Sequence, residues 1–434
     1  MNFFDSKFFQ ESYQFNQEIK NSNIPEITYP STTIRIKGDD FYKDIWREID
    51  NAKDYCWIQT YAMDATFPAK LTIIKMIEAL KRGVTCVLYV DDLQQYVDKN
   101  LIKEFQENGG IYKSLNPTWR HIYRNVPSQE FFRRHHEKLV VIDDFSVIGS
   151  QNFQDCYGSD KFGNGEFYDF NVMFKNQNLR NFRHQFLNVS DLYDLKLSNE
   201  LSRDEAILKQ DQNYPDSPFQ TTKRLLTRTH QPFLRQIQVN ILKMIDDAEK
   251  KITLIHPYYY PIPKFEKAIQ RALKRGVKVE LITSGKRDQP VYHYITNSIL
   301  TKNLTKSGCE VYEIKEKLLH MKAYQIDDKH YSIGSFNNDR WSWKLNNEIN
   351  IQVNNDPIEV QRLDQVINQV KSESKKISDQ YSKVGPIRYA KILFWDTFLY
   401  LSEVIMSKNK YVSLEKYDYR KIYNDWDDQS NFNF

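Results

Sequence analysis

Two short segments that lie far apart in the chain carry the same chemically useful residues at nearly the same spacing. Each begins with a histidine followed two residues later by a lysine, and each ends in the pattern Gly-Ser-x-Asn: His136, Lys138, Ser150 and Asn152 in the first, His320, Lys322, Ser335 and Asn337 in the second. Residues i and i+2 of a strand share a face, so each histidine should project beside its lysine. The lysine charge and the serine and asparagine donors together suit a phosphate group.

Two copies of such a site could divide the work of phosphoryl transfer. An imidazole has a pKa near neutrality, so it can act as a nucleophile when neutral or as a general acid when protonated. If the two segments face each other, one histidine can attack phosphorus while the other protonates the departing oxygen. A single His-x-Lys pattern is common on exposed strands, but two with the same trailing residues favour chemistry.

An aspartate follows each lysine by five residues, at Asp143 and Asp327. At that distance the aspartates should lie beyond the strand and stabilise the turn, so we assign them no catalytic role. Five residues separate Asp143 from Gly149, whereas six separate Asp327 from Gly334, which predicts a tighter turn in the first half.

The elements that position these segments are also duplicated. The phrase Ala-Leu-Lys-Arg-Gly-Val occurs at 79–84 and again at 272–277, and each copy follows the order amphipathic run, apolar run, amphipathic run, β-branched run. This order predicts helix, strand, helix, strand in each half, with the glycine ending the second helix. Alternation of this kind favours an α/β fold in which helices cover a sheet.

These patterns divide the chain into five parts. We expect an N-terminal extension at 1–32, a first domain at 33–197, a polar linker at 198–223, a second domain at 224–375, and a C-terminal helical segment and tail at 376–434. Residues 389–406 are rich in aromatic and aliphatic side chains but are interrupted by Lys391, Asp396 and Glu403. That segment is either a helix lying in a membrane interface or a core helix covering the second domain.

Composition excludes several classes of protein. With 434 residues, 40% of them apolar and 27% charged, the chain is globular rather than disordered or fibrous. A net charge of +4 gives little support to nucleic-acid binding. The four cysteines show no metal-ligand spacing, "HHEK" does not extend to a zinc-protease motif, and no Gly-x4-Gly-Lys phosphate loop occurs. The sequence contains no run long enough for a spanning helix. Residues 1–30 resemble neither a signal nor a transit peptide, so we expect either that no targeting segment exists or that it was removed before this numbering begins.

The paired segments resemble those of the phospholipase D superfamily. Within it, "RRHHEKLVVIDD" (133–144) and "LLHMKAYQIDDKHYSIGSFNNDRWSWKLNNEIN" (318–350) are similar to the phospholipase-D-type cardiolipin synthases, as are "WIQTYAMD" (57–64) and the repeated "ALKRGV". The similarity extends over residues 33–405. It implies two tandem phospholipase-D-like domains, each a mixed, mainly parallel sheet flanked by helices, packed as a pseudo-two-fold pair.

The resemblance also implies roles for individual residues, in a transfer through a phosphohistidine without metal or other cofactor. His136 would be the nucleophile and His320 the general acid, and Lys138 and Lys322 would hold the phosphoryl oxygens. Glu348 would orient His320, and Asp169 would be the corresponding acid of the first half. The residues that would help to bind the phosphate are Ser150, Asn152, Ser335 and Asn337.

The implied reaction joins two phosphatidylglycerols into cardiolipin and releases glycerol, so the expected partners are these anionic phospholipids and a membrane surface. In a eukaryote this chemistry would belong at the mitochondrial inner membrane. Two alternatives stay open. One is another phosphodiesterase of the superfamily, a phospholipase or a nuclease. The other is a non-catalytic, lipid-binding subunit of a membrane protein complex.

Overall fold

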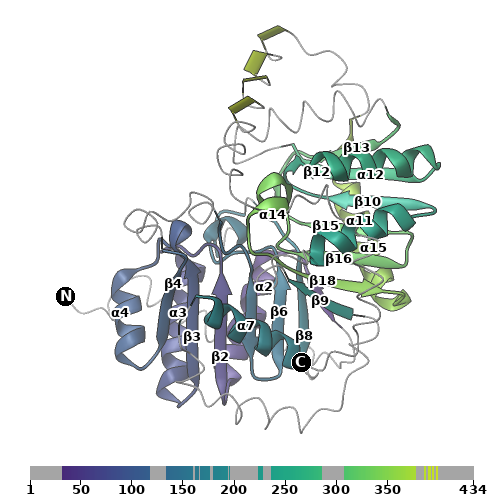
Figure 1. The fold of residues 1–434 in the computed structure, drawn as a ribbon. Helices are drawn as coiled ribbons and strands as arrows, with labels where there is room; N and C mark the ends of the chain where they lie inside the picture. Colours follow the sequence, from purple (N-terminus) through teal and green to yellow (C-terminus); the bar gives the residue numbers. More distant parts are fainter. Residues whose placement is uncertain are drawn as a thin grey trace.

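The fold is that of a computed structural model (Figure 1). It describes residues 32–117, 133–159, 162–165, 167–175, 179–193, 195, 223–227, 236–285 and 307–377, together with four pairs of residues between 386 and 398. The predicted N-terminal extension and linker therefore lie almost wholly outside the described residues.

The first domain is built on a seven-stranded sheet whose strands follow the order β1-β8-β6-β5-β2-β3-β4. Its strands and helices are, in chain order, β1 (Thr33–Arg35), α2 (Gly38–Asn51), β2 (Tyr55–Thr60), α3 (Phe67–Lys81), β3 (Thr85–Asp91), the 3₁₀ helix η2 (Asp92–Gln94), α4 (Lys99–Glu107), β4 (Ile111–Leu115), β5 (Leu139–Ile142), β6 (Phe145–Gly149), the 3₁₀ helix η3 (Asp155–Tyr157), β7 (Phe167–Tyr168), β8 (Asn171–Lys175) and α7 (Arg180–Leu192).

The second domain repeats this plan on an eight-stranded sheet of order β19-β13-β12-β10-β15-β16-β18-β9. Its elements are β9 (Lys223–Thr227), α11 (Gln236–Asp247), β10 (Lys251–Ile255), β11 (Tyr259–Tyr260), α12 (Pro263–Lys274), β12 (Lys278–Ser284), β13 (Glu310–Ile314), β14 (Leu318–Leu319), β15 (Ala323–Ile326), β16 (His330–Gly334), β17 (Asn338–Asp339), α14 (Arg340–Lys344), β18 (Ile349–Asn354), α15 (Pro357–Ser372) and β19 (Ser374–Lys376).

The repeated order of helices and strands is as the sequence predicts. In each half a helix, a strand, a second helix and a second strand follow one another, as α2-β2-α3-β3 and as α11-β10-α12-β12. The second helix of each half ends before a glycine with positive φ, +93° at Gly83 and +87° at Gly276. A left-handed conformation is easily adopted only by glycine, which explains why both repeats place one there.

The sheets are mixed, as expected, but parallel pairing is not predominant in them. It is confined to β2-β3-β4 and β10-β12-β13, and the other pairs in both sheets are antiparallel. The reason is that β5 and β6, like β15 and β16, are joined by tight hairpins, which can connect only antiparallel strands. Parallel pairs require a crossover, and only the α3, α4 and α12 regions provide one among the elements described.

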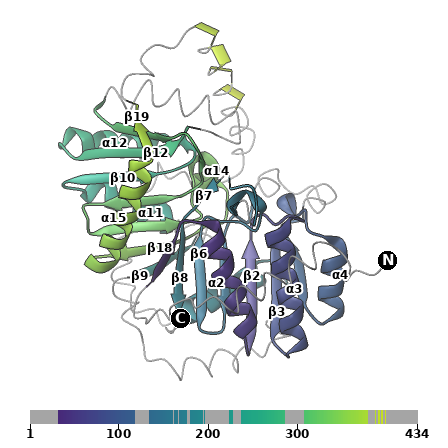
Figure 2. The same cartoon turned by 180° about the vertical axis from the view of Figure 1, so that it is seen from behind.

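The two domains share one apolar layer. Trp57 and Phe186 of the first domain belong to the same buried cluster as Ile333 and Ile351 of the second. Strands β6 and β8 lie against β16 and β18 at this boundary. Figure 1 shows α7 on one face of the first sheet, and Figure 2 shows α2 and α3 on the opposite face, where a separate apolar cluster lies. The domains are therefore packed through a common core.

The described residues between 386 and 398 are all exposed. Ile387, Leu393, Phe394 and Phe398 have 76%, 53%, 62% and 53% of their surface accessible, and Figures 1 and 2 show these pieces, in yellow-green, apart from both sheets. The alternative of a core helix covering the second domain is therefore wrong for the part of this segment that is described. No helix in the described residues is long and apolar enough to cross a membrane.

Candidate active site

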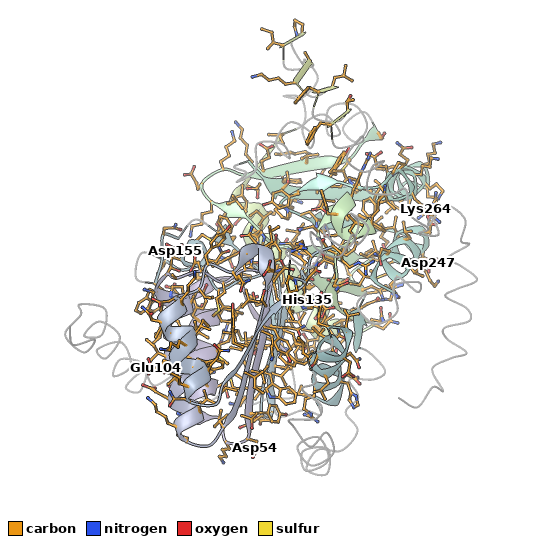
Figure 3. The ribbon with its side chains drawn as sticks, turned by 60° about the vertical axis from the view of Figure 1, so that its left-hand side comes forward. Asp54, Glu104, His135, Asp155, Asp247 and Lys264 are labelled. Carbon is orange, nitrogen blue, oxygen red and sulfur yellow. The ribbon has the colours of Figure 1, made fainter. Side chains whose placement is uncertain are left out.

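Each histidine is held by backbone hydrogen bonds to the other domain. The His136 N–H donates to the carbonyl of Asn347 (2.9 Å), and the Asn347 N–H donates to the carbonyl of Arg134 (2.9 Å). On the opposite side, β14 pairs in parallel with β7, and the His320 N–H donates to the carbonyl of Tyr168 (2.7 Å). His135, next to His136, is labelled in Figure 3 near the boundary between the domains. These cross-domain ladders bring both predicted histidines to one place.

The acid that orients each histidine also comes from the other domain. His136 Nδ1 lies 2.9 Å from Glu348 Oε2, and His320 Nδ1 lies 2.8 Å from Asp169 Oδ2. The expectation that Glu348 orients His320 is therefore wrong. Each carboxylate follows the Gly-Ser-x-Asn segment of its own half, but the packing of the halves carries it across the boundary. Spacing along the chain contains no signal for that exchange.

The two motif serines support the carboxylates. The Ser335 hydroxyl donates to Glu348 Oε2 (2.5 Å), and the Ser150 hydroxyl donates to Asp169 Oδ1. A hydroxyl carries a single hydrogen, so in this arrangement neither serine has a donor left for a phosphate group. The predicted phosphate-binding role of the serines is corrected to one of holding Asp169 and Glu348.

Both motif lysines are buried beside their histidines. Lys138 Nζ donates to the carbonyl of His136 (2.9 Å) and lies 5.5 Å from the ring centre of Tyr61. Lys322 Nζ donates to the carbonyl of His320 (2.8 Å) and also contacts His320 Nε2 (2.9 Å). Burial and the charge of Lys322 lower the pKa of Lys138 to about 7. Because both lysines are buried away from water, their positive charges are poorly solvated, and the site favours the binding of an anionic ligand.

The two asparagines differ. Asn152 Oδ1 accepts from the Ala62 N–H (3.2 Å), and its Nδ2 donates to the Tyr157 hydroxyl (3.0 Å). Asn337 is also buried, but its Oδ1 has no hydrogen-bond partner among the described residues. The side chain of Asn152 is thus committed to the first domain, whereas Asn337 retains hydrogen-bonding capacity.

The two motif aspartates stabilise turns, as predicted. Asp327 accepts hydrogen bonds from the N–H groups of Glu249, Lys250 and Lys251, at 2.6, 2.7 and 2.8 Å. Asp143 accepts the equivalent three in the first domain. Hairpin register confirms the tighter first turn, because two residues separate Ile142 from its partner Phe145 and three separate Ile326 from its partner His330.

The charge states follow from burial. Burial, aided by Lys138, lowers the pKa of His136 to about 4, although Glu348 opposes the shift. Burial and Lys322 also lower the pKa of His320. Burial alone would raise the pKa of Glu348, but His136, Lys138 and Ser335 together hold it below its usual range. At neutral pH His136 is therefore a neutral imidazole whose Nδ1 hydrogen faces an ionised carboxylate.

Three further residues complete the site, and the sequence patterns assigned none of them a role. Tyr61 places its ring edge-on to His136, with ring centres 4.9 Å apart. The Ser342 hydroxyl donates to Glu348 Oε1 (2.6 Å), and the Tyr157 hydroxyl lies 3.3 Å from His320 Nδ1. A signal did exist for two of them, since Tyr157 and Ser342 each follow the motif serine of their half by seven positions. Within the described residues no three His, Cys, Asp or Glu side chains are grouped to hold a metal ion.

Comparison with a solved structure agrees with this fold. The fold is similar to that of phosphatidylserine synthase from Haemophilus influenzae Rd KW20, with a TM-score of 0.65, 13% identity, and coverage of 91% of this chain and 99% of that one. The fold and the paired His-Lys segments define the class, a two-domain α/β protein with its site at the boundary between the domains.

Sequence comparison identifies the family. The family model described as "Cardiolipin synthase, PLD-like domain" matches residues 45–162 and 241–371. Cardiolipin synthase 2 of Staphylococcus epidermidis is 26% identical over 359 residues, 81% of this chain and 70% of that protein. Cardiolipin synthase B of Escherichia coli K12 is 24% identical over 322 residues, 72% of this chain and 74% of that protein. The chain belongs to the phospholipase-D-like cardiolipin synthase family, a family of phosphatidyltransferases.

Proposed function

We propose that this protein joins two phosphatidylglycerols into cardiolipin and releases glycerol through a phosphohistidine intermediate. The observation that carries the proposal is the pair of crossed contacts, His136 with Glu348 and His320 with Asp169. They give two imidazoles of fixed tautomer in one buried site that also contains two lysines. The names of the related proteins support the choice of lipid.

In the first step His136 Nε2 attacks the phosphorus of one phosphatidylglycerol. A P–N bond forms, the P–O bond to glycerol breaks, and protonated His320 gives its proton to the departing oxygen. In the second step neutral His320 takes the proton from a hydroxyl of the second phosphatidylglycerol. That oxygen attacks phosphorus, the P–N bond breaks, and His136 is restored.

The contacts of the two Nε2 atoms support His136 as the nucleophile. His320 Nε2 is in contact with Lys322, whereas His136 Nε2 has no hydrogen-bond partner among the described residues. The low pKa of His136 keeps that nitrogen unprotonated at neutral pH. A bound phosphodiester brings negative charge, which attracts Lys322 and raises the pKa of His320, so substrate binding prepares the acid.

A direct test is turnover of phosphatidylglycerol vesicles by the purified protein, followed by mass spectrometry of the lipids. We expect cardiolipin from the wild type and none from His136→Ala or His320→Ala. His330→Ala is the matched control, because His330 lies at the start of β16, at the far end of that strand from Ser335. Phosphatidic acid as the main product would show a hydrolase, and no turnover despite vesicle binding would favour the structural subunit.

A lipid with a nitrophenolate leaving group tests which histidine attacks. Nitrophenolate departs without protonation, so the first step no longer needs a general acid. We expect His320→Ala to release a burst of nitrophenolate equal to the enzyme concentration, and His136→Ala to release none. The reverse result would exchange the two assignments.

We also propose that the exposed apolar residues near the C-terminus bring the site to a membrane surface. Phe394 and Phe398 stack with ring centres 6.5 Å apart, and exposed Lys391 precedes them in the chain, a combination suited to an anionic lipid interface. In a eukaryotic cell the chemistry would place the protein at the mitochondrial inner membrane.

The double variant Phe394→Ser with Phe398→Ser should sediment less with phosphatidylglycerol vesicles. Ile358→Ser, which changes an equally exposed residue on α15, should not weaken sedimentation. Equal binding by all three proteins would reject this surface.

A further inference from the structure

The residue seven positions after each motif serine supports one of the two histidine–carboxylate pairs. In the second half this residue is Ser342, whose hydroxyl donates to Glu348 Oε1 (2.6 Å), and Glu348 in turn contacts His136. In the first half it is Tyr157, whose longer side chain reaches past the carboxylate to the histidine itself. The Tyr157 oxygen lies 3.3 Å from His320 Nδ1, the atom that also contacts Asp169. The same position therefore serves both pairs by different contacts.

The Tyr157 hydroxyl is fixed from several directions. Its ring packs edge-on against Phe167, with centres 5.0 Å apart, and against the imidazole of His320 at 5.5 Å. The side chain is buried, and Asn152 Nδ2 donates to the hydroxyl oxygen (3.0 Å). This is the asparagine that the sequence pattern assigned to phosphate binding.

The hydrogen on His320 Nδ1 decides what the tyrosine can do. Asp169 requires that hydrogen, because an unprotonated Nδ1 would face a carboxylate oxygen at 2.8 Å without a proton between them. The Tyr157 oxygen beside the same nitrogen is therefore a second acceptor for the same N–H. A second acceptor stabilises the imidazolium form, in which the N–H is most strongly polarised.

We propose that Tyr157 is a positioning residue for His320: its hydroxyl oxygen, oriented by Asn152, shares the Nδ1 hydrogen with Asp169 and favours the protonated ring. The catalytic consequence rests on the proposed role of His320 as the general acid. The structural part does not, because it concerns only the protonation equilibrium of one imidazole. The chain Asn152–Tyr157–His320 thus connects the Gly-Ser-x-Asn loop of one domain to the histidine of the other.

The first test measures that equilibrium without requiring activity. The full-length protein, labelled with ¹³C at the histidine rings, is titrated by NMR, and the signals of His320 and His136 are assigned from their alanine variants. Tyr157→Phe keeps the ring and removes the hydroxyl. We expect it to lower the pKa of His320 by about half a unit to one unit and to leave that of His136 unchanged. An unchanged His320 titration would overturn the proposal.

The second test separates this role from simple packing. Tyr157→Phe should slow transfer from phosphatidylglycerol about tenfold and move the basic limb of its pH profile to lower pH, while the nitrophenolate burst is preserved. Ser342→Ala, which acts through Glu348 and His136, should instead diminish the burst.

The matched control is Tyr89→Phe, a buried tyrosine of the same domain whose hydroxyl contacts Ser190. If Tyr157→Phe lost the same fraction of activity on both substrates and its pH profile did not shift, the role of Tyr157 would be purely structural. A wild-type protein without turnover would reject the proposed function alone, since the titration result stands apart from it.

Discussion

Burial sets the pH range over which the two candidate groups His136 and Lys138 can act. Below a pH of about 4 His136 binds a proton and loses the lone pair that attacks phosphorus. Above a pH of about 7 Lys138 loses its proton and no longer neutralises the phosphoryl oxygens. With the nitrophenolate lipid, which needs no general acid, kcat/KM should therefore fall on both sides of this range.

The assignment of the basic limb can be checked with Lys138→Arg, because a guanidinium stays charged throughout. Measured by quenched assay between pH 3.5 and 9, roughly the range these groups span, the variant should lose the basic limb and keep the acidic one. A basic limb that remains at the same pH in Lys138→Arg would show that another group controls it.

The crossed contacts predict opposite effects for two conservative substitutions. Glu348→Gln removes the charge that holds His136, so it should reduce the nitrophenolate burst rate by about 10²- to 10⁴-fold. Asp169→Asn acts on His320, so it should leave that burst nearly unchanged and slow transfer from phosphatidylglycerol. Stopped-flow and lipid mass spectrometry provide the two readouts. If Asp169→Asn abolished the burst while Glu348→Gln spared it, each carboxylate would serve the histidine of its own half.

At the scale of the elements, the turn aspartates fix where each hairpin meets the neighbouring helix. Asp327→Asn replaces a carboxylate that accepts three backbone N–H groups, and asparagine tolerates the positive φ of 55° at this position. We expect the free energy of unfolding to fall by about 1–3 kcal/mol, measured by urea denaturation, with unchanged kcat in the folded protein. Asp328→Asn, its exposed neighbour with a similar φ of 53°, should change neither. Lost turnover at full stability would instead give Asp327 a chemical role.

The order of the elements was predictable because local signals determine it. Glycines at 83 and 276 end helices, and the β-branched runs after them form buried strands. The direction in which neighbouring strands pair was less predictable. Mainly parallel sheets were expected, but the hairpins β5-β6 and β15-β16 make most neighbouring strands antiparallel. The histidines and lysines were found from the repeat, and Glu348 and Asp169 from the family resemblance. The partners of these two carboxylates were not predicted, since those contacts exist only once the halves pack.

The whole molecule should stay together when its linker is cut. The shared apolar cluster and the two cross-domain ladders hold the halves without help from the connecting chain. A site for a sequence-specific protease inserted within the predicted linker, 198–223, should allow complete cleavage with retained activity and co-elution of both fragments in size-exclusion chromatography. Uncut protein treated with protease lacking a target site is the control. Fragments that separate in native buffer would contradict a common core.

Each histidine contacts a carboxylate from the other half, and this arrangement has a consequence for how the sequence can evolve. Duplication normally leaves two copies free to diverge, each constrained by its own needs. Here a change at position 169 is felt by the histidine at 320, and a change at 348 by the histidine at 136. The two halves therefore cannot change independently at these positions. A substitution in one half should be compensated by a substitution in the other half rather than in the same half.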